Sequence, residues 1–239
     1  MAIANNHEYN GNLAKYKVVA FDVDGTLYDQ KRLRLIMAVR LGKFYLTHPL
    51  RMKELLIVKN FRTNLEHFNE IAQKSDIPEE ALKDAVSYTA YSMKEDEARV
   101  RAIVDKWIYK NPLDVIKMTS DDRLCNLFSL LKKCGFKVVV FSDHPVSDKL
   151  DALSLEADAV YYTGDGRLKD VKPSPKGVEL IASDWGVGYE QILIIGDRYE
   201  KDGMSAVNAG SDYLIVDRDV SKRGRVHDEL LAEVRNIAE

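Results

Sequence analysis

The chain has 239 residues, 46% of them hydrophobic, which is enough for one sizeable buried core and a smaller second domain. Its formal net charge of −3 excludes the overall basic footprint of a nucleic-acid-binding protein. No apolar run approaches the ~20 residues of a membrane span, and residues 1–13 lack the apolar centre of a signal peptide. We therefore expect a cytoplasmic protein whose first dozen residues are frayed.

The two cysteines, Cys125 and Cys134, fall nine positions apart within one predicted helix. That separation along a single helix is too large for a disulfide. We expect both to be buried, reduced thiols, as is usual in a reducing compartment.

An apolar run over residues 16–21, which predicts a short buried strand, is followed by Asp22-Val23-Asp24-Gly25-Thr26. If the strand continues, its alternation directs Asp22 and Asp24 to the same side. Gly25 permits a turn that brings backbone amides close to a ligand, and the Thr26 hydroxyl can bond backbone or substrate. A solvated acidic turn is the alternative, but three further segments disfavour it.

Each of these segments follows an apolar run or lies in a loop beyond one. Ser142 follows the run 137–141, Lys172 begins Lys172-Pro173-Ser174-Pro175, and Asp197 follows the run 192–195, with Asp202 five residues further on. Strands predicted at 16–21, 137–141, 159–162, 192–195 and 213–216 alternate with helices. The alternation indicates a doubly wound parallel α/β sheet. Sites in such sheets form outside the carboxyl ends of the strands, where these residues fall.

In this order, the segments resemble the four motifs of the haloacid dehalogenase superfamily of hydrolases, in the group with a helical cap inserted between the first and second motifs. The resemblance implies a Rossmann-like core, and its most specific part is Asp22-x-Asp24-Gly25-Thr26. Phosphatases and phosphomutases of the superfamily have the second aspartate, and its dehalogenases lack it. We therefore expect a core over residues 15–29 and 112–239, with an all-helical cap of about four helices over residues 30–111.

The chemistry of the residues and the resemblance imply the same catalytic roles. Asp22 is the expected nucleophile that forms an aspartyl-phosphate, Asp24 is the acid and then the base, and Lys172 stabilises charge on the phosphoryl group. Hard oxygen ligands suit Mg²⁺. The resemblance places the metal on the Asp22 side chain, the Asp24 backbone carbonyl and Asp197, with Asp202 binding it directly or through water.

Three residues are the expected substrate contacts: Thr26 and Ser142 through their hydroxyls, and Asp143 through its backbone amide. The Asp143 side chain would add an acid near an anionic substrate, so we expect it to point away. Together these residues predict an Mg²⁺-dependent phosphatase that acts on a small phosphorylated metabolite. A phosphomutase with the same core and a non-catalytic binding module remain alternatives, and the chain would be a monomer or homodimer without a nucleic-acid partner.

Charge is distributed unevenly along the chain. Residues 31–63 carry nine Lys or Arg against Glu54 alone, a local net charge of +8, which leaves −11 for the remainder. Three explanations stay open. The stretch is a solvated face whose long stems cover apolar surface, a surface that steers a polyanionic substrate, or a basic patch that docks on an anionic membrane or another macromolecule.

Overall fold

The computed structural model describes residues 7–73 and 76–238. The chain divides into two compact units, a core unit of residues 1–32 and 116–239 and an insert over Leu33–Val115. The insert is expected at residues 30–111, and the structure divides the chain at Leu33 and Val115. That the insert works as a cap remains a proposal.

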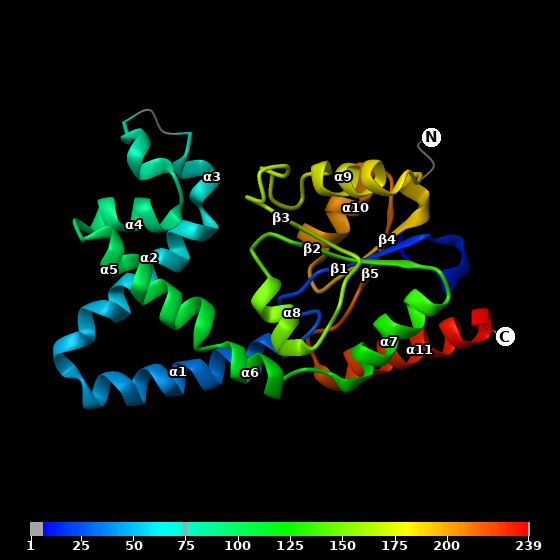
Figure 1. Cartoon of the computed structure of the whole chain (residues 1–239), viewed down its shortest axis with the longest axis horizontal. Coiled ribbons are helices and arrows are strands. Elements are labelled where there is room, and N and C mark those ends of the chain that lie inside the picture. The colour runs from blue at the N-terminus through cyan, green and yellow to red at the C-terminus, as the bar shows by residue number, and fades with distance from the viewer. Residues whose placement is uncertain (1–6, 74–75, 239) are drawn as a thin grey trace. The chain divides into compact units, whose positions relative to one another are not determined.

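The core unit contains a five-stranded parallel sheet in the order β3-β2-β1-β4-β5, which confirms the doubly wound α/β fold (Figure 1). The strands are β1 (Val18–Phe21), β2 (Lys137–Ser142), β3 (Ala159–Tyr162), β4 (Ile192–Gly196) and β5 (Asp212–Ile215). The chain order reverses at β1, where β2 pairs on one side and β4 on the other. This is the topological switch point at which such sheets bind ligands.

Helices cover both faces of this sheet. In Figure 1, α9 (Lys176–Trp185) and α10 (Met204–Ala209) lie on one face, and α7 (Asp122–Lys133) and α11 (Val220–Ala238) lie on the other. The helix α8 (Ser147–Leu153) follows β2. All four residues of β1 are buried, as expected for a strand covered on both faces. The sequence prediction did not include α11.

Alternation along β1 sends its side chains to two separate apolar layers. Val18 and Ala20 pack in the cluster that contains Val178 and Ile181 of α9. On the opposite face, the Phe21 ring lies 4.7 Å from that of Phe128 of α7. Each Val, Ile or Phe side chain among these contributes about 1.5–3 kcal/mol on burial, so both layers hold the end of β1 in place.

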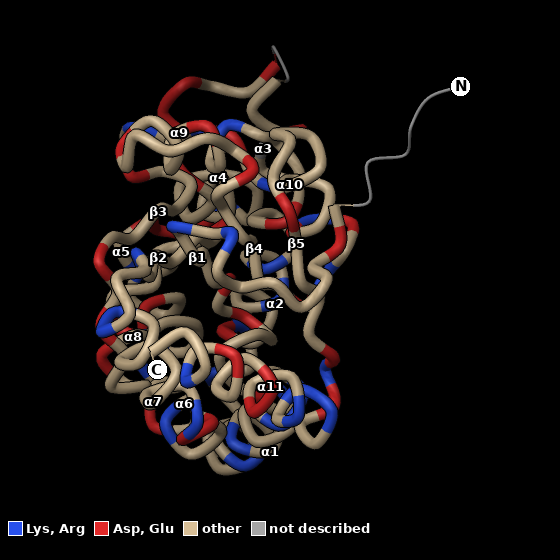
Figure 2. Tube along the Cα trace, turned by 90° about the vertical axis from the view of Figure 1, so that its right-hand side faces the viewer, with Lys and Arg blue, Asp and Glu red and all other residues tan. Residues whose placement is uncertain are grey.

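The insert is helical throughout its described residues. Its elements are α1 (Gln30–Thr47), η2 (Pro49–Arg51), α2 (Met52–Glu66), α3 (Phe68–Ile71), η3 (Glu79–Leu82), α4 (Ala85–Met93), α5 (Glu97–Val104), η4 (Asp105–Lys110) and α6 (Leu113–Met118), of which α1 and α6 cross the boundaries of the unit. It is therefore divided into more segments than the four we expect. Lys and Arg, blue in Figure 2, recur along α1, where the sequence is most basic.

The described part of the N-terminal segment, residues 7–13, packs on the core unit, so the expectation of fraying is wrong for these residues. Tyr9 N–H donates to the Tyr213 carbonyl at 2.8 Å, and Tyr213 N–H donates to the His7 carbonyl at 2.8 Å. Leu13 is buried at the start of η1 (Leu13–Lys15). The segment thus pairs with the edge strand β5, and residues 1–6 lie outside the described part.

Both cysteines are free thiols, but the expectation that both are buried is wrong, because Cys125 is exposed and Cys134 is only partly buried. The buried stripe of α7 consists of Leu124, Leu127, Phe128 and Leu131, and Cys125 falls outside it and is exposed. Among the described residues, no helix is both long enough and apolar enough to cross a membrane.

Candidate active site

The turn that follows β1, residues 22–28, is called the β1 turn below. Asp22 N–H donates to the Ile195 carbonyl at 2.8 Å and so continues the pairing of β1 with β4. Gly25 has φ +100°, and a Cβ atom there would lie 2.5 Å from Asp197 Oδ2. Only glycine fits this conformation and this distance, so the turn lies directly against Asp197.

Three buried carboxylates, called the acidic cluster below, meet at the carboxyl ends of β1 and β4. One oxygen from each of Asp22, Asp197 and Asp202 lies within 4.8 Å of the others. Asp202 belongs to the short π-helix η6 (Tyr199–Gly203). It approaches because Gly196 has no side chain, since a Cβ atom there would lie 2.2 Å from Asp202 Cγ.

The acidic cluster fits a divalent cation with oxygen ligands. Asp197 Oδ1 is buried without a hydrogen-bond partner among the described residues, whereas Oδ2 accepts from Arg218 Nε at 2.7 Å. Burial raises the pKa of Asp197 although Arg218 opposes the shift. Carboxylates this close repel one another unless cations offset their charge, and Mg²⁺ and Ca²⁺ prefer such ligands.

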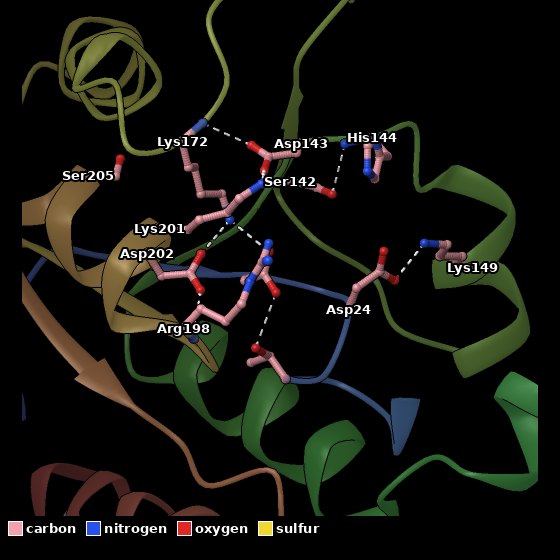
Figure 3. Close-up of polar contacts among 12 residues, drawn as sticks. Asp24, Ser142, Asp143, His144, Lys149, Lys172, Arg198, Lys201, Asp202 and Ser205 are labelled. Carbon is pink, nitrogen blue, oxygen red and sulfur yellow. Dashed lines mark hydrogen bonds and ion pairs between the residues drawn. The ribbon is translucent and has the colours of Figure 1, made fainter. Parts of the chain in front are cut away.

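Lys172 bridges two members of the acidic cluster. Its Nζ donates to Asp22 Oδ1 at 2.7 Å and to Asp202 Oδ1 at 2.6 Å, and only 2% of the residue is exposed. Burial opposes the ammonium charge, but the two carboxylates outweigh it and raise the pKa of Lys172. Burial also raises the pKa of Asp22 to about 7, against the attraction of Lys172. Figure 3 shows Lys172 between Asp202 and Asp143.

Asp24 lies apart from the acidic cluster, beside α8 (Figure 3). Its Oδ1 accepts from Lys149 Nζ at 2.6 Å and from the Tyr28 hydroxyl. Burial alone would raise the pKa of Asp24, but Lys149 and Tyr28 hold it below its usual value. The expected strand alternation of Asp22 and Asp24 is wrong, because β1 ends at Phe21 and the backbone turns over residues 24–27.

The three expected substrate contacts lie around this site but have protein partners. The Thr26 hydroxyl donates to Asp22 Oδ2 at 3.3 Å, and Ser142 Oγ, which is buried, accepts from His144 N–H at 3.2 Å. The Asp143 carboxylate accepts from Lys172 N–H at 3.0 Å and from Lys201 Nζ at 2.8 Å. These bonds lower the pKa of Asp143 against the effect of its burial.

Sequence reasoning missed the cations that hold these carboxylates, namely Lys149, Arg218 and Lys201, and the role of Tyr28. Lys149 comes seven residues after Ser142 on α8, and Arg218 follows β5. Neither position belongs to a recognisable motif. Both residues follow the carboxyl end of a strand. That position alone could have marked them as candidates, because the acidic cluster lies at this end of the sheet.

Several solved structures share the fold of this chain. A phosphatase from Thermococcus onnurineus is 18% identical with a TM-score of 0.53 and covers 85% of this chain and 87% of its own. A 2-haloacid dehalogenase from Pseudomonas syringae is 16% identical with a TM-score of 0.59, covering 84% and 86%. A hydrolase from Deinococcus radiodurans, solved with bound phosphate and sodium, is 16% identical with a TM-score of 0.51, covering 94% and 97%.

These identities support the fold alone, and the neighbours include both phosphatases and dehalogenases. No curated protein matches the sequence. The family model of haloacid dehalogenase-like hydrolases matches residues 16–210, which include the β1 turn, Ser142, Lys172 and the acidic cluster. The chain therefore belongs to the haloacid dehalogenase-like hydrolases.

Proposed function

We propose that this hydrolase is a phosphatase that cleaves a small phosphomonoester through an aspartyl-phosphate on Asp22. The observation that carries the proposal is the second carboxylate, Asp24, which lies two residues after Asp22 and outside the acidic cluster. Lys149 and Tyr28 hold Asp24 at the side of α8. A dehalogenase has no use for an acid in this position, because a halide leaves without a proton.

The residues supply both halves of such a reaction. An oxygen of Asp22 attacks phosphorus, the bond from phosphorus to the leaving oxygen breaks, and Asp24 passes a proton to that oxygen. Against the effect of burial, Lys149 and Tyr28 keep the pKa of Asp24 low, so this proton enters with the monoanionic phosphomonoester. Asp24 then takes a proton from the water that attacks phosphorus, and the bond from phosphorus to Asp22 breaks. The products are the alcohol and inorganic phosphate. Asp24 passes this second proton to the phosphate, so Asp22 and Asp24 both end as carboxylates.

The acidic cluster would hold Mg²⁺ through Asp22, Asp197 and Asp202, with the Asp24 backbone carbonyl as a further ligand. The orphaned Oδ1 of Asp197 supports this assignment. A bound divalent cation would offset negative charge on the phosphoryl group. Lys172 would add a second positive charge, and the Ser142 hydroxyl and the Asp143 amide would donate hydrogen bonds to phosphoryl oxygens.

The insert would act as a cap that excludes water and selects the leaving group. Its position between the first and second motifs supports this role, because the chain leaves the core just after the β1 turn and returns before α7. A cap of this kind favours a small phosphorylated metabolite as substrate over a phosphoprotein.

The test is release of inorganic phosphate from an aryl phosphate and a panel of metabolite phosphates, with and without Mg²⁺. We expect metal-dependent release that Asp22→Asn abolishes, with a loss of at least ~10⁴-fold in kcat for a missing nucleophile. Asp151→Asn, which changes an exposed carboxylate of α8, is the control and should retain activity. Isomeric phosphates in place of free phosphate would indicate a phosphomutase, and halide release from 2-haloacids without phosphate release would overturn the proposal.

A further inference from the structure

We propose that the C-terminal helix α11 supplies a positioning residue, Arg223, which fixes the β1 turn against the acidic cluster. The inference rests on the proposed function and adds a residue to it. Helix α11 (Val220–Ala238) lies outside the residues 16–210 that the family model matches. The contact therefore joins the matched part of the chain to a helix that the family model does not cover.

Arg223 binds two backbone carbonyls of the β1 turn. Its Nη1 donates to the Gly25 carbonyl at 2.8 Å and to the Tyr28 carbonyl at 3.3 Å. Within the β1 turn, Thr26 N–H and Leu27 N–H both donate to the Val23 carbonyl, at 3.3 and 3.0 Å. One guanidinium nitrogen thus joins two carbonyls of the turn that carries Asp22 and Asp24.

The burial of the Arg223 guanidinium costs desolvation energy, which an apolar residue in the same place would not cost. The residue is 1% exposed, and its Nε has no hydrogen-bond partner among the described residues. Burial lowers the pKa of Arg223, while the carboxylates of Asp29, Asp121 and Asp197 oppose the shift. Apolar residues of similar volume often stabilise a fold as well as a buried charge does, so the cation indicates a role beyond stability.

Helix α11 is held firmly enough to act as a support. Its Leu230, Leu231 and Val234 are buried, and its contacts with α7 include a layer of charges. In that layer Asp121 accepts from Arg123 Nε at 2.8 Å and pairs with His227 Nδ1 at 2.9 Å.

The residue after Arg223 also contributes to this contact. Gly224 leaves room for Arg123, since a Cβ atom there would lie 2.3 Å from Arg123 Nη2. Arg123 Nη1 in turn donates to Asp228 Oδ2 on α11 at 3.0 Å. Arg223 therefore projects from a helix that contacts with α7 fix directly after it.

Movement of the β1 turn would disturb the site directly. Gly25, whose carbonyl Arg223 binds, lies so close to Asp197 that a Cβ atom would come within 2.5 Å of it. Asp22 and Asp24 precede this glycine in the same turn. Arg223 thus sets the distance between the turn and Asp197, and its loss should affect metal binding and turnover more than substrate binding.

The test compares Arg223→Met, Arg223→Lys and Arg225→Met. Arg225 is exposed on the same helix and serves as the control. Mg²⁺ binding is measured by calorimetry without substrate, and kcat and KM are measured at saturating Mg²⁺. We expect Arg223→Met to lose about 10–100-fold in Mg²⁺ affinity or kcat, the range for residues that orient ligands indirectly, with KM changed less than about 2-fold. Arg223→Lys should recover part of the loss, and Arg225→Met should behave as the parent.

A structural role alone would give a different pattern. Leu230→Ala removes a buried side chain of α11 and lowers the melting temperature without touching the β1 turn. If Arg223→Met matches Leu230→Ala, with a lower melting temperature but parental kcat and Mg²⁺ affinity in the folded protein, the inference is overturned. If the parent releases no phosphate, the proposed function fails, and Mg²⁺ affinity alone then decides whether Arg223 positions the turn.

Discussion

The site of the core unit and the insert differ in how their charged residues are paired. Around the site of the core unit, ion pairs join residues far apart in sequence, such as the buried pair of Lys172 with Asp22 and the partly buried pair of Lys149 with Asp24. In the insert, most pairs are short-range and exposed on at least one side. Examples are Arg51 with Glu54, Arg99 with Glu95 and Arg101 with Glu97.

The two kinds of ion pair differ in how much their charges contribute to stability. An exposed pair contributes about 0–1 kcal/mol and is screened by salt. A buried pair costs desolvation energy for both ions, and it becomes strongly destabilising when one partner is removed. A site with several buried charges persists only because each charge offsets another, and this arrangement positions the carboxylates of the core unit for reaction.

The largest expected effect comes from Lys172→Met, which removes the two buried ion pairs of Lys172. Removal of the ammonium leaves Asp22 and Asp202 buried without their shared cation. We expect the free energy of unfolding in Mg²⁺-free buffer to fall by about 3–5 kcal/mol, measured by urea titration. The control is Lys176→Met, which removes an exposed pair with Glu179 and should cost less than about 0.5 kcal/mol. Equal effects of the two variants would contradict the comparison.

The same contrast explains how much the sequence could reveal. Strand ends and residue types located Asp22, Ser142 and the Asp197 segment, because apolar runs predict strands and parallel strands align their carboxyl ends. Lys172 lies in a loop, and the order of the four motifs indicated it. Register supports this, since Phe21 pairs with both Val140 and Ile195.

Residues on helices could not be located in this way. Lys149 and Arg223 reach the β1 turn from α8 and α11, at sequence separations of 125 and 198. Only tertiary packing decides which lysine or arginine of a helix points inward. The direction of the Asp24 side chain could not be predicted from the sequence either, since it depends on where β1 ends.

An intermediate effect is expected at the contact between α7 and α11, through Asp121→Asn. Burial alone would raise the pKa of Asp121, but His227 and Arg123 hold it well below its usual value. A lowered pKa in the folded state stabilises the protein above the unfolded value of ~3.9 and loses this effect as the pH falls. We expect Asp121→Asn to cost about 1.5–3 kcal/mol at pH 7, as for other hydrogen bonds to charged groups.

The pH dependence distinguishes this charge effect from a packing effect. Asparagine caps a helix about as well as aspartate, so the variant removes the charge and largely keeps the cap of α7. The difference in unfolding free energy between parent and variant should shrink as the pH falls below about 4. A difference that stays constant from pH 7 to pH 3 would assign the loss to packing.

The smallest effect is expected in the basic part of the insert. It tests which of the three explanations of its positive charge is correct. Arg40 binds Asp114 through two nitrogens, at 2.8 and 2.7 Å, so its charge is already paired within the insert. Arg34 is exposed, and its charge, together with burial, lowers the pKa of Arg62. If the basic surface steers a polyanionic substrate, Arg34→Ala should raise the KM of the best metabolite phosphate by up to ~5-fold at low salt. The KM of an aryl phosphate should stay unchanged.

Arg40→Ala is the matched control for this last prediction, because it removes the same side chain type from the same helix, α1. It should lower the free energy of unfolding by no more than about 1 kcal/mol, as for other exposed pairs, and leave both KM values unchanged. Added salt should abolish the effect of Arg34→Ala, because ~1 M ionic strength shortens the screening length to about 3 Å. An equal rise in KM for both substrates, or a rise that persists at high salt, would exclude steering. The basic face would then be a solvated cover of the helices or a docking surface for another partner.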